Sequence, residues 1–130
     1  MILPKMERLI VLDTETTGIE LSEGHRIIEV GAVQILDREI TSTEFHEYVQ
    51  PNKKVGQSVN IHGITDKFLI NKPQFNQISD DLLSFIEGAT LVIHNAPFDL
   101  GFLNNELKII GIKETIEDFC NIIDLSLIHI

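Results

Sequence analysis

The chain has 130 residues, of which 43% are hydrophobic, a size and composition that suit one globular domain and argue against disorder. Ten basic residues against twenty acidic ones give a net charge of −10, which taken alone argues against a nucleic-acid partner. A single cysteine, Cys120, excludes an internal disulfide framework, and no apolar run reaches the roughly 18 residues of a membrane helix, so we expect a soluble, cytoplasmic domain without a membrane contact.

The first half of the chain predicts three consecutive strands. Residues 9–12 form a short apolar run followed by a turn, which is typical of a buried strand. Residues 26–36 are rich in β-branched side chains and predict a long second strand, and the alternation at 45–49 predicts a third that ends near Pro51. Residues 37–39 indicate a hairpin between the second and third strands, so we expect antiparallel pairing.

The second half changes to a helical period. Apolar residues recur at spacings of three and four over 75–86 and again over 98–110, and each stretch predicts a helix that ends near a glycine. Residues 91–93 predict a short buried strand between these helices, and residues 116–123 predict a fifth strand. Three antiparallel strands followed by α-β-α-β indicate an α/β fold, a mixed sheet flanked by helices.

Two carboxylates follow the first predicted strand. Asp13 and Glu15 are two residues apart, so their side chains share one face of the strand while Thr14 points to the other. Two carboxylates held close together repel each other, and a divalent cation between them removes that penalty. The alternative is a pair of solvated acids at a strand end, and the Asp-x-Glu pattern alone does not separate the two.

A third carboxylate follows the strand at 91–93. Asn95 can cap the next helix, Pro97 suits its first turn, and Asp99 then lies where the helix dipole favours negative charge. A plain helix-start carboxylate is the alternative interpretation. If this strand lies parallel to the first, Asp99 approaches Asp13 and Glu15, and three oxygen ligands suit Mg²⁺ or Mn²⁺ in two-metal phosphoryl chemistry.

These motifs carry a family resemblance. The sequence DTETTG at 13–18 resembles the first motif of the DnaQ-like (DEDD) 3′–5′ exonucleases, and NAPFD at 95–99 resembles the second. Further segments are similar as well, IIEVGA at 27–32, HGIT at 62–65 and LVIH at 91–94. The resemblance covers about residues 7–124, the expected exonuclease domain, and is closest to the proofreading epsilon subunits of bacterial DNA polymerase III.

The resemblance implies a ribonuclease H-like fold and proofreading hydrolysis of DNA from its 3′ end, with release of deoxynucleoside 5′-monophosphates. Asp13 would bridge two divalent cations, Mg²⁺ or Mn²⁺, Glu15 would hold the ion that carries the attacking water, and Asp99 would hold the other. The implied partners are a single-stranded or frayed DNA 3′ end and the polymerase III alpha and theta subunits. Besides the acids Asp13 and Glu15, the implied substrate contacts are Thr16, Thr17, Gly18, Gln57, His62, Asn95 and Phe98.

The sequence departs from the family pattern in two places. Gln57 falls where some relatives carry an acidic substrate contact. The family's third motif, His-x-Ala-x-x-x-Asp or His-x-x-x-x-Asp on a later helix, does not follow the second motif, because His129 has only one residue after it. The general-base histidine is therefore absent from these 130 residues, and we expect the chain to be weakly stable and inactive or severely impaired.

The two ends of the sequence carry expectations of their own. Residues 125–130 can be encoded by a transposon end common in sequencing-library adapters, so we expect them to be read-through, with the C-terminal helices of the fold missing. A natural apolar C-terminus is the alternative. Either Met1 or Met6 can be the native start.

Two other functions compete with a proofreading exonuclease. A related nuclease could act on RNA or on small oligonucleotides, and substrate choice would separate the two. A noncatalytic module that docks to a polymerase would explain the missing third motif. Retention of Asp13, Glu15 and Asp99 together argues against such a module.

Overall fold

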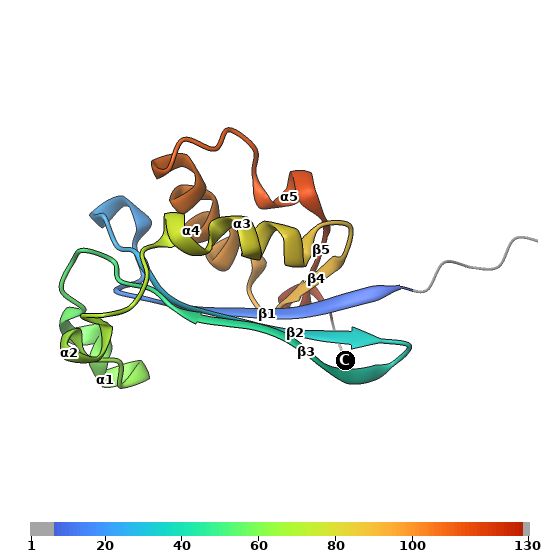
Figure 1. Cartoon of the computed structure of the whole chain (residues 1–130), viewed down its shortest axis with the longest axis horizontal. Coiled ribbons are helices and arrows are strands. Elements are labelled where there is room, and N and C mark those ends of the chain that lie inside the picture. The colour runs from blue at the N-terminus through green and yellow to red at the C-terminus, as the bar shows by residue number, and fades with distance from the viewer. Residues whose placement is uncertain (1–6, 129–130) are drawn as a thin grey trace, which may run out of the picture.

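A computed structural model of the chain describes residues 7–128, and the two alternative starts and His129 lie outside the described residues. The five strands form one sheet in the order β3-β2-β1-β4-β5 (Figure 1). β1 pairs antiparallel with β2 and β2 antiparallel with β3, whereas β4 pairs parallel with β1 and β5 parallel with β4. The predicted mixed sheet is confirmed. The strands are β1 (Arg8–Thr16), β2 (Ile27–Leu36), β3 (Glu39–Tyr48), β4 (Thr90–Ile93) and β5 (Asn121–Asp124).

The two long helices lie on the same side of the sheet (Figure 1). They span the ranges that the apolar spacing predicts and are followed by left-handed glycines, Gly88 and Gly111. Within the described residues, no helix is long and apolar enough to cross a membrane. The helices are α1 (Val59–His62), α2 (Asp66–Leu69), α3 (Phe75–Ile86), α4 (Ala96–Ile109) and α5 (Ile116–Phe119).

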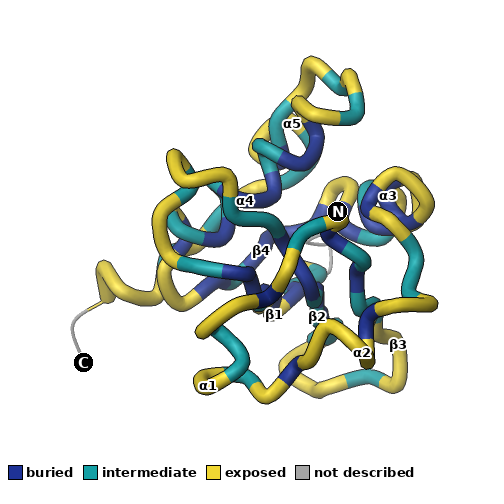
Figure 2. The backbone as a smooth tube through the Cα atoms, turned by 90° about the vertical axis from the view of Figure 1, so that its left-hand side faces the viewer, coloured by how far each residue is buried: buried dark blue, intermediate teal, exposed yellow. Residues whose placement is uncertain are grey.

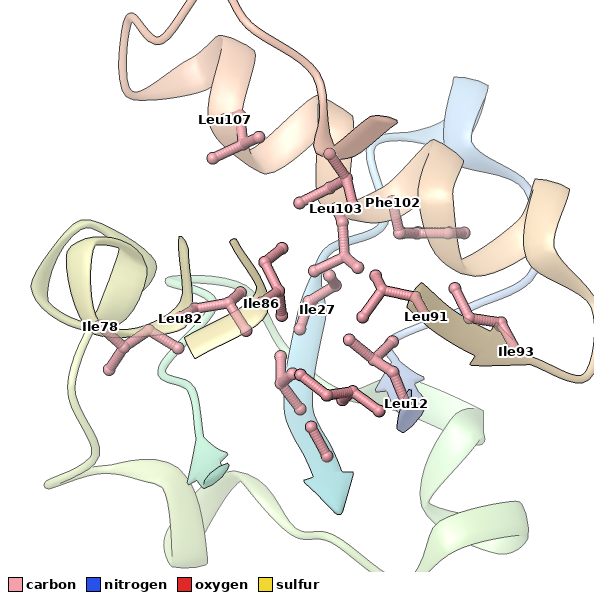
Figure 3. Close-up of a cluster of buried hydrophobic side chains, with 14 of the residues drawn as sticks. Leu12, Ile27, Ile78, Leu82, Ile86, Leu91, Ile93, Phe102, Leu103 and Leu107 are labelled. Atoms are coloured by element: carbon pink, nitrogen blue, oxygen red, sulfur yellow. The ribbon is translucent and has the colours of Figure 1, made fainter. Parts of the chain in front are cut away.

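The main core lies between the sheet and these helices. Alternate residues of β1, such as Ile10 and Leu12, are buried. Both belong to the same cluster as Leu82 of α3 and Leu103 of α4, and Figure 3 shows Leu12 with these two leucines. Figure 2 shows the same pattern along the chain, with buried stretches where the sheet meets the helices and exposed turns around them. The core therefore fixes the position of α4 against the carboxyl end of β1.

The opposite face of the sheet is more open. One row of register partners crosses it, Val33 of β2, Val11 of β1, Val92 of β4 and Ile123 of β5. Val11 is 41% exposed and Ile123 is 38% exposed, although both are apolar. Asp13 follows Val11 by two residues and therefore stands on this open face.

One predicted element is partly wrong. The sequence predicts a strand over 116–123, but α5 occupies its first half and the strand is limited to Asn121–Asp124. The physical reason is a capping box, in which the Thr115 N–H donates to Asp118 Oδ2 at 2.8 Å. Ile116, fully buried, anchors the turn in the core, and this burial outweighs its β propensity.

Candidate active site

The first two carboxylates stand on the open face of β1, as predicted. Burial alternates along the strand, so Asp13 is exposed and Glu15 half-buried, while Thr14 and Thr16 point inward and are only 7% and 8% exposed. The net effect of the surroundings is to raise the pKa of Glu15. Burial is the largest cause and the charge of Asp13 the next, whereas the charge of His62 acts in the opposite direction. The two carboxylates therefore repel each other across the strand end.

The third carboxylate comes from the other side of β1. Asp99 lies in the first turn of α4 and is 6% exposed. Its Oδ2 accepts two hydrogen bonds from Thr14, one from the backbone N–H at 3.1 Å and one from the hydroxyl at 3.0 Å. The pKa of Asp99 is raised to about 6, mainly by burial. The hydrogen bond from the Thr14 hydroxyl opposes this rise, and the charge of Asp13 adds to it.

The three carboxylates do not form a closed ligand set. Among residues 7–128, no group of three His, Cys, Asp or Glu side chains lies close enough to hold a metal ion. The reason is that Thr14 binds Asp99 on the inner face of the strand, whereas Asp13 and Glu15 point outward. Asp99 thus reaches the residue between Asp13 and Glu15 from the inner face of β1, and the charge of Asp13 raises the pKa of both other acids.

The donor set nevertheless fits a divalent cation. All three groups offer carboxylate oxygens, the ligands that Mg²⁺ and Mn²⁺ take in proteins. Asp13 is exposed and acts on both Glu15 and Asp99, and a cation beside it would remove both repulsions.

The turn after β1 uses its threonine hydroxyls internally. The Thr16 hydroxyl donates to the Gly18 carbonyl at 2.6 Å. The Thr17 hydroxyl accepts from the Arg26 N–H at 3.0 Å and lies 3.0 Å from His25 Nδ1. A Cβ on Gly18 would collide with the His25 ring, so a larger residue there would force that ring to move. The Thr17 N–H also donates to the Arg26 carbonyl at 2.9 Å, so the turn is held to the residue before β2. The resemblance implies that backbone groups of this turn contact the substrate.

His62 and Gln57 lie on the segment that enters and forms α1. His62 Nδ1 accepts from the Ile64 N–H at 3.0 Å, and its Nε2 lies 3.0 Å from the Ser58 hydroxyl. The charge of His62 lowers the pKa of Glu15, against the effects of burial and of Asp13. Gln57 is exposed in the short turn Gly56–Ser58.

The start of α4 corrects one prediction. Asn95 is the residue before the helix, but its side chain makes no capping hydrogen bond, because its backbone (φ −136°, ψ 75°) departs from the extended conformation of a capping residue. Its carbonyl accepts from the Phe98 N–H at 3.0 Å instead. Pro97 occupies the first turn as predicted, and the half-buried Phe98 ring packs on Phe102 with centroids 4.9 Å apart.

A buried ion pair that the sequence did not reveal holds α4 to the sheet. Glu106 is 1% exposed, and its two oxygens accept from Arg26 Nε and Nη2 at 2.7 Å each. The Ile27 N–H donates to the same carboxylate at 3.2 Å. Glu106 lies seven residues after Asp99 on α4, so two buried acids bind this helix to β1 and β2.

The raised pKa of Asp99 predicts how stability depends on pH. The value in the fold, about 6, lies above the ordinary 3.8, so the folded state keeps a proton that the unfolded chain releases between these two values. In metal-free buffer, we expect the free energy of unfolding to fall as pH rises from about 4 to 6, and Asp99→Asn to reduce this slope, leaving the smaller part due to Glu15. Urea titrations of both proteins at several pH values measure it. Parallel curves for the two proteins would contradict the assignment.

Comparisons with known proteins identify the family of this chain. The family model described as "Exonuclease" (RNase_T) matches residues 10–128. The DNA polymerase III subunit epsilon of Buchnera aphidicola subsp. Acyrthosiphon pisum (strain APS) is 50% identical over 123 residues, which cover 91% of this chain and 52% of that protein. The same subunit of Escherichia coli (strain K12) is 44% identical over 124 residues, 90% of this chain and 51% of that protein.

A solved structure supports the fold alone. A crystal structure of exonuclease I in complex with the inhibitor BCBP superposes with a TM-score of 0.75 at 16% identity, over 94% of this chain and 29% of that one. The match places the fold in the ribonuclease H-like class, as expected. The chain spans about half the length of the curated relatives it matches.

Proposed function

The chain belongs to the RNase_T exonuclease family, and from this premise we propose that it removes nucleotides from the 3′ end of DNA in a proofreading role, releasing deoxynucleoside 5′-monophosphates. The observation that carries the proposal is the placement of Asp99, whose carboxylate binds Thr14, the residue between Asp13 and Glu15 at the carboxyl end of β1. A phosphodiester is a polyanion, and these acids would repel it unless cations intervene. The net charge of −10 is therefore no obstacle to a nucleic-acid substrate.

The family depends on divalent metal ions, and Mg²⁺ or Mn²⁺ is our proposal for this chain. Asp13 would hold both ions, Glu15 the first and Asp99 the second. When bound, such a pair activates a water molecule and stabilises the leaving 3′ oxygen. The contribution of Thr14 is to fix Asp99 through two hydrogen bonds, which limits the rotation of that carboxylate.

The surroundings of these acids would bind the terminal nucleotide. The turn after β1 would contact it through Thr16, Thr17 and Gly18, and the hydrogen bonds of the two threonine hydroxyls keep this turn in place. His62, the last residue of α1, lowers the pKa of Glu15. Phe98 offers a half-buried ring at the start of α4. The proposed substrate contacts are Asp13, Glu15, Thr16, Thr17, Gly18, Gln57, His62, Asn95 and Phe98.

The proposed partners follow from the relatives. Proteins named as DNA polymerase III epsilon subunits share 44% and 50% identity with this chain. On that ground we assign the protein to polymerase III, in contact with its alpha and theta subunits, and to the cytoplasm. Co-purification with a polymerase alpha subunit from the same organism tests this assignment.

A degradation assay tests the activity. We expect a 5′-labelled DNA strand, incubated with the chain and Mn²⁺, to shorten from its 3′ end. Because these 130 residues lack the third motif, the rate should be about 10²–10⁴-fold below that of the E. coli relative. A rate equal to the relative's, internal cuts or shortening from the 5′ end would contradict the proposal. An RNA strand of the same sequence, run in parallel, distinguishes a DNA enzyme from an RNA enzyme.

A further inference from the structure

A groove continues from the candidate active site along the end of the sheet. It has a volume of about 650 Å³, within the size range of ligand sites, and it begins at Thr17 and Gly18. One wall is the segment between β1 and β2, and the other is the segment between β3 and α1 (Figure 1). The groove therefore starts where the terminal nucleotide is proposed to lie and leads away from it.

The two walls are joined by a lysine. Lys53 Nζ donates to the carbonyls of Glu23 at 3.4 Å and Gly24 at 3.1 Å, on the opposite wall. The ammonium group of Lys53 thereby links the two segments that form the walls of the groove. It is one half of Lys53-Lys54, the only adjacent basic pair in the sequence.

The neighbouring Lys54 has a different environment. It lines the same groove and is exposed. Within residues 7–128 it makes no salt bridge and no side-chain hydrogen bond, so its charge is directed to solvent. The acids of the groove, Glu20 and Glu23, belong to the opposite wall. A phosphate passing through the groove is thus attracted to the Lys54 wall and repelled from the other.

We propose that Lys54 binds a backbone phosphate of the single strand, upstream of the nucleotide at the carboxylates. The inference rests on the proposed function, because it takes the 3′ end to lie against Thr17 and Gly18. A lysine is a compact point charge on a flexible stem, so it holds a phosphate without reading the base. Lys54 is a positioning residue and takes no part in the chemistry.

Binding measurements on three variants test this role. The probe is a labelled oligothymidylate with phosphorothioate linkages, titrated with the chain in Mn²⁺ at several salt concentrations. We expect Lys54→Gln to weaken binding at least about threefold and to reduce the salt slope by about 0.7, the value for one phosphate contact of a single strand. Lys54→Arg should retain both, because it keeps the charge. Lys113→Gln is the matched control, since Lys113 is an exposed lysine that lines a different cavity.

The outcomes separate this inference from the proposed function. If Lys54→Gln matches Lys113→Gln in affinity and salt slope while the wild type still binds the strand with Mn²⁺, Lys54 has no such role and the proposed function stands. If the wild type binds Mn²⁺ but not the strand, the proposed function fails, and the inference fails with it. Equal Mn²⁺ affinity of Lys54→Gln and the wild type confirms that the variant is folded.

Discussion

Replacing Asp13 by alanine should abolish Mn²⁺ binding. Asp13 is exposed beside Glu15 and acts on the pKa of both Glu15 and Asp99, so it is the acid that both proposed ions share. Loss of a residue that merely supports a ligand costs 10–100-fold in metal affinity, so loss of a shared ligand should cost more than about 100-fold. Isothermal titration of Mn²⁺ into both proteins measures the change.

The control for this variant is another exposed acid. Glu39→Ala removes the same charge at the hairpin between β2 and β3, where Glu39 pairs with Leu36. It should leave Mn²⁺ affinity within about twofold, since exposed charges more than a Debye length of about 10 Å apart are largely screened at 0.1 M salt. Equal affinity losses in the two variants would mean that Mn²⁺ responds only to net charge, and the proposed metal site would be wrong.

Glu106→Ala should strongly destabilise the fold. It leaves the Arg26 guanidinium without its two bonds of 2.7 Å and the Ile27 N–H without its acceptor, and it removes one of two acids that bind α4 to the sheet. Breaking a buried pair from one side costs 3–5 kcal/mol; because the Arg26 side chain is 24% exposed, we expect about 3 kcal/mol. The shift of the urea midpoint at constant slope measures it.

A control variant and a double variant test whether the loss of stability comes from the broken ion pair. Glu114→Ala changes an exposed acid just after the same helix and should cost less than about 0.5 kcal/mol. The double variant Arg26→Met with Glu106→Leu removes both charges and should recover part of the loss, because no buried charge then remains unpaired. If Glu106→Ala costs no more than Glu114→Ala, the pair does not anchor α4.

The sequence predicts the long elements of this fold because their patterns are local. The helical spacing over 75–86 and the β-branched run over 26–36 give almost the observed bounds. The four-residue helices α1 and α2 were missed, since each is too short to show a period. They depend on single positions, a left-handed Gly63 after α1 and a Thr65 hydroxyl that accepts from the Phe68 N–H before α2.

In the candidate site, too, the local features could be predicted from the sequence and the features that depend on distant residues could not. The shared face of Asp13 and Glu15 follows from strand geometry, and the structure has it. The direction of Asp99 could not be predicted, because it depends on a hydrogen bond to Thr14, 85 residues earlier. Glu106 was missed for the same reason, since its partner Arg26 lies 80 residues away and an isolated glutamate predicts an exposed position.

The measurement that tests the central claim most directly compares a linear with a circular single strand of DNA. Both strands offer the same phosphates and bases, but only the linear strand has the 3′ end that the site at Asp13, Glu15 and Asp99 is proposed to hold. With Mn²⁺ present we expect the chain to bind the linear strand at least about tenfold more tightly, a difference of about 1.4 kcal/mol, and to lose this preference when Mn²⁺ is removed or in Asp13→Ala. Equal binding of both strands, or a preference that survives without the metal, would contradict the account.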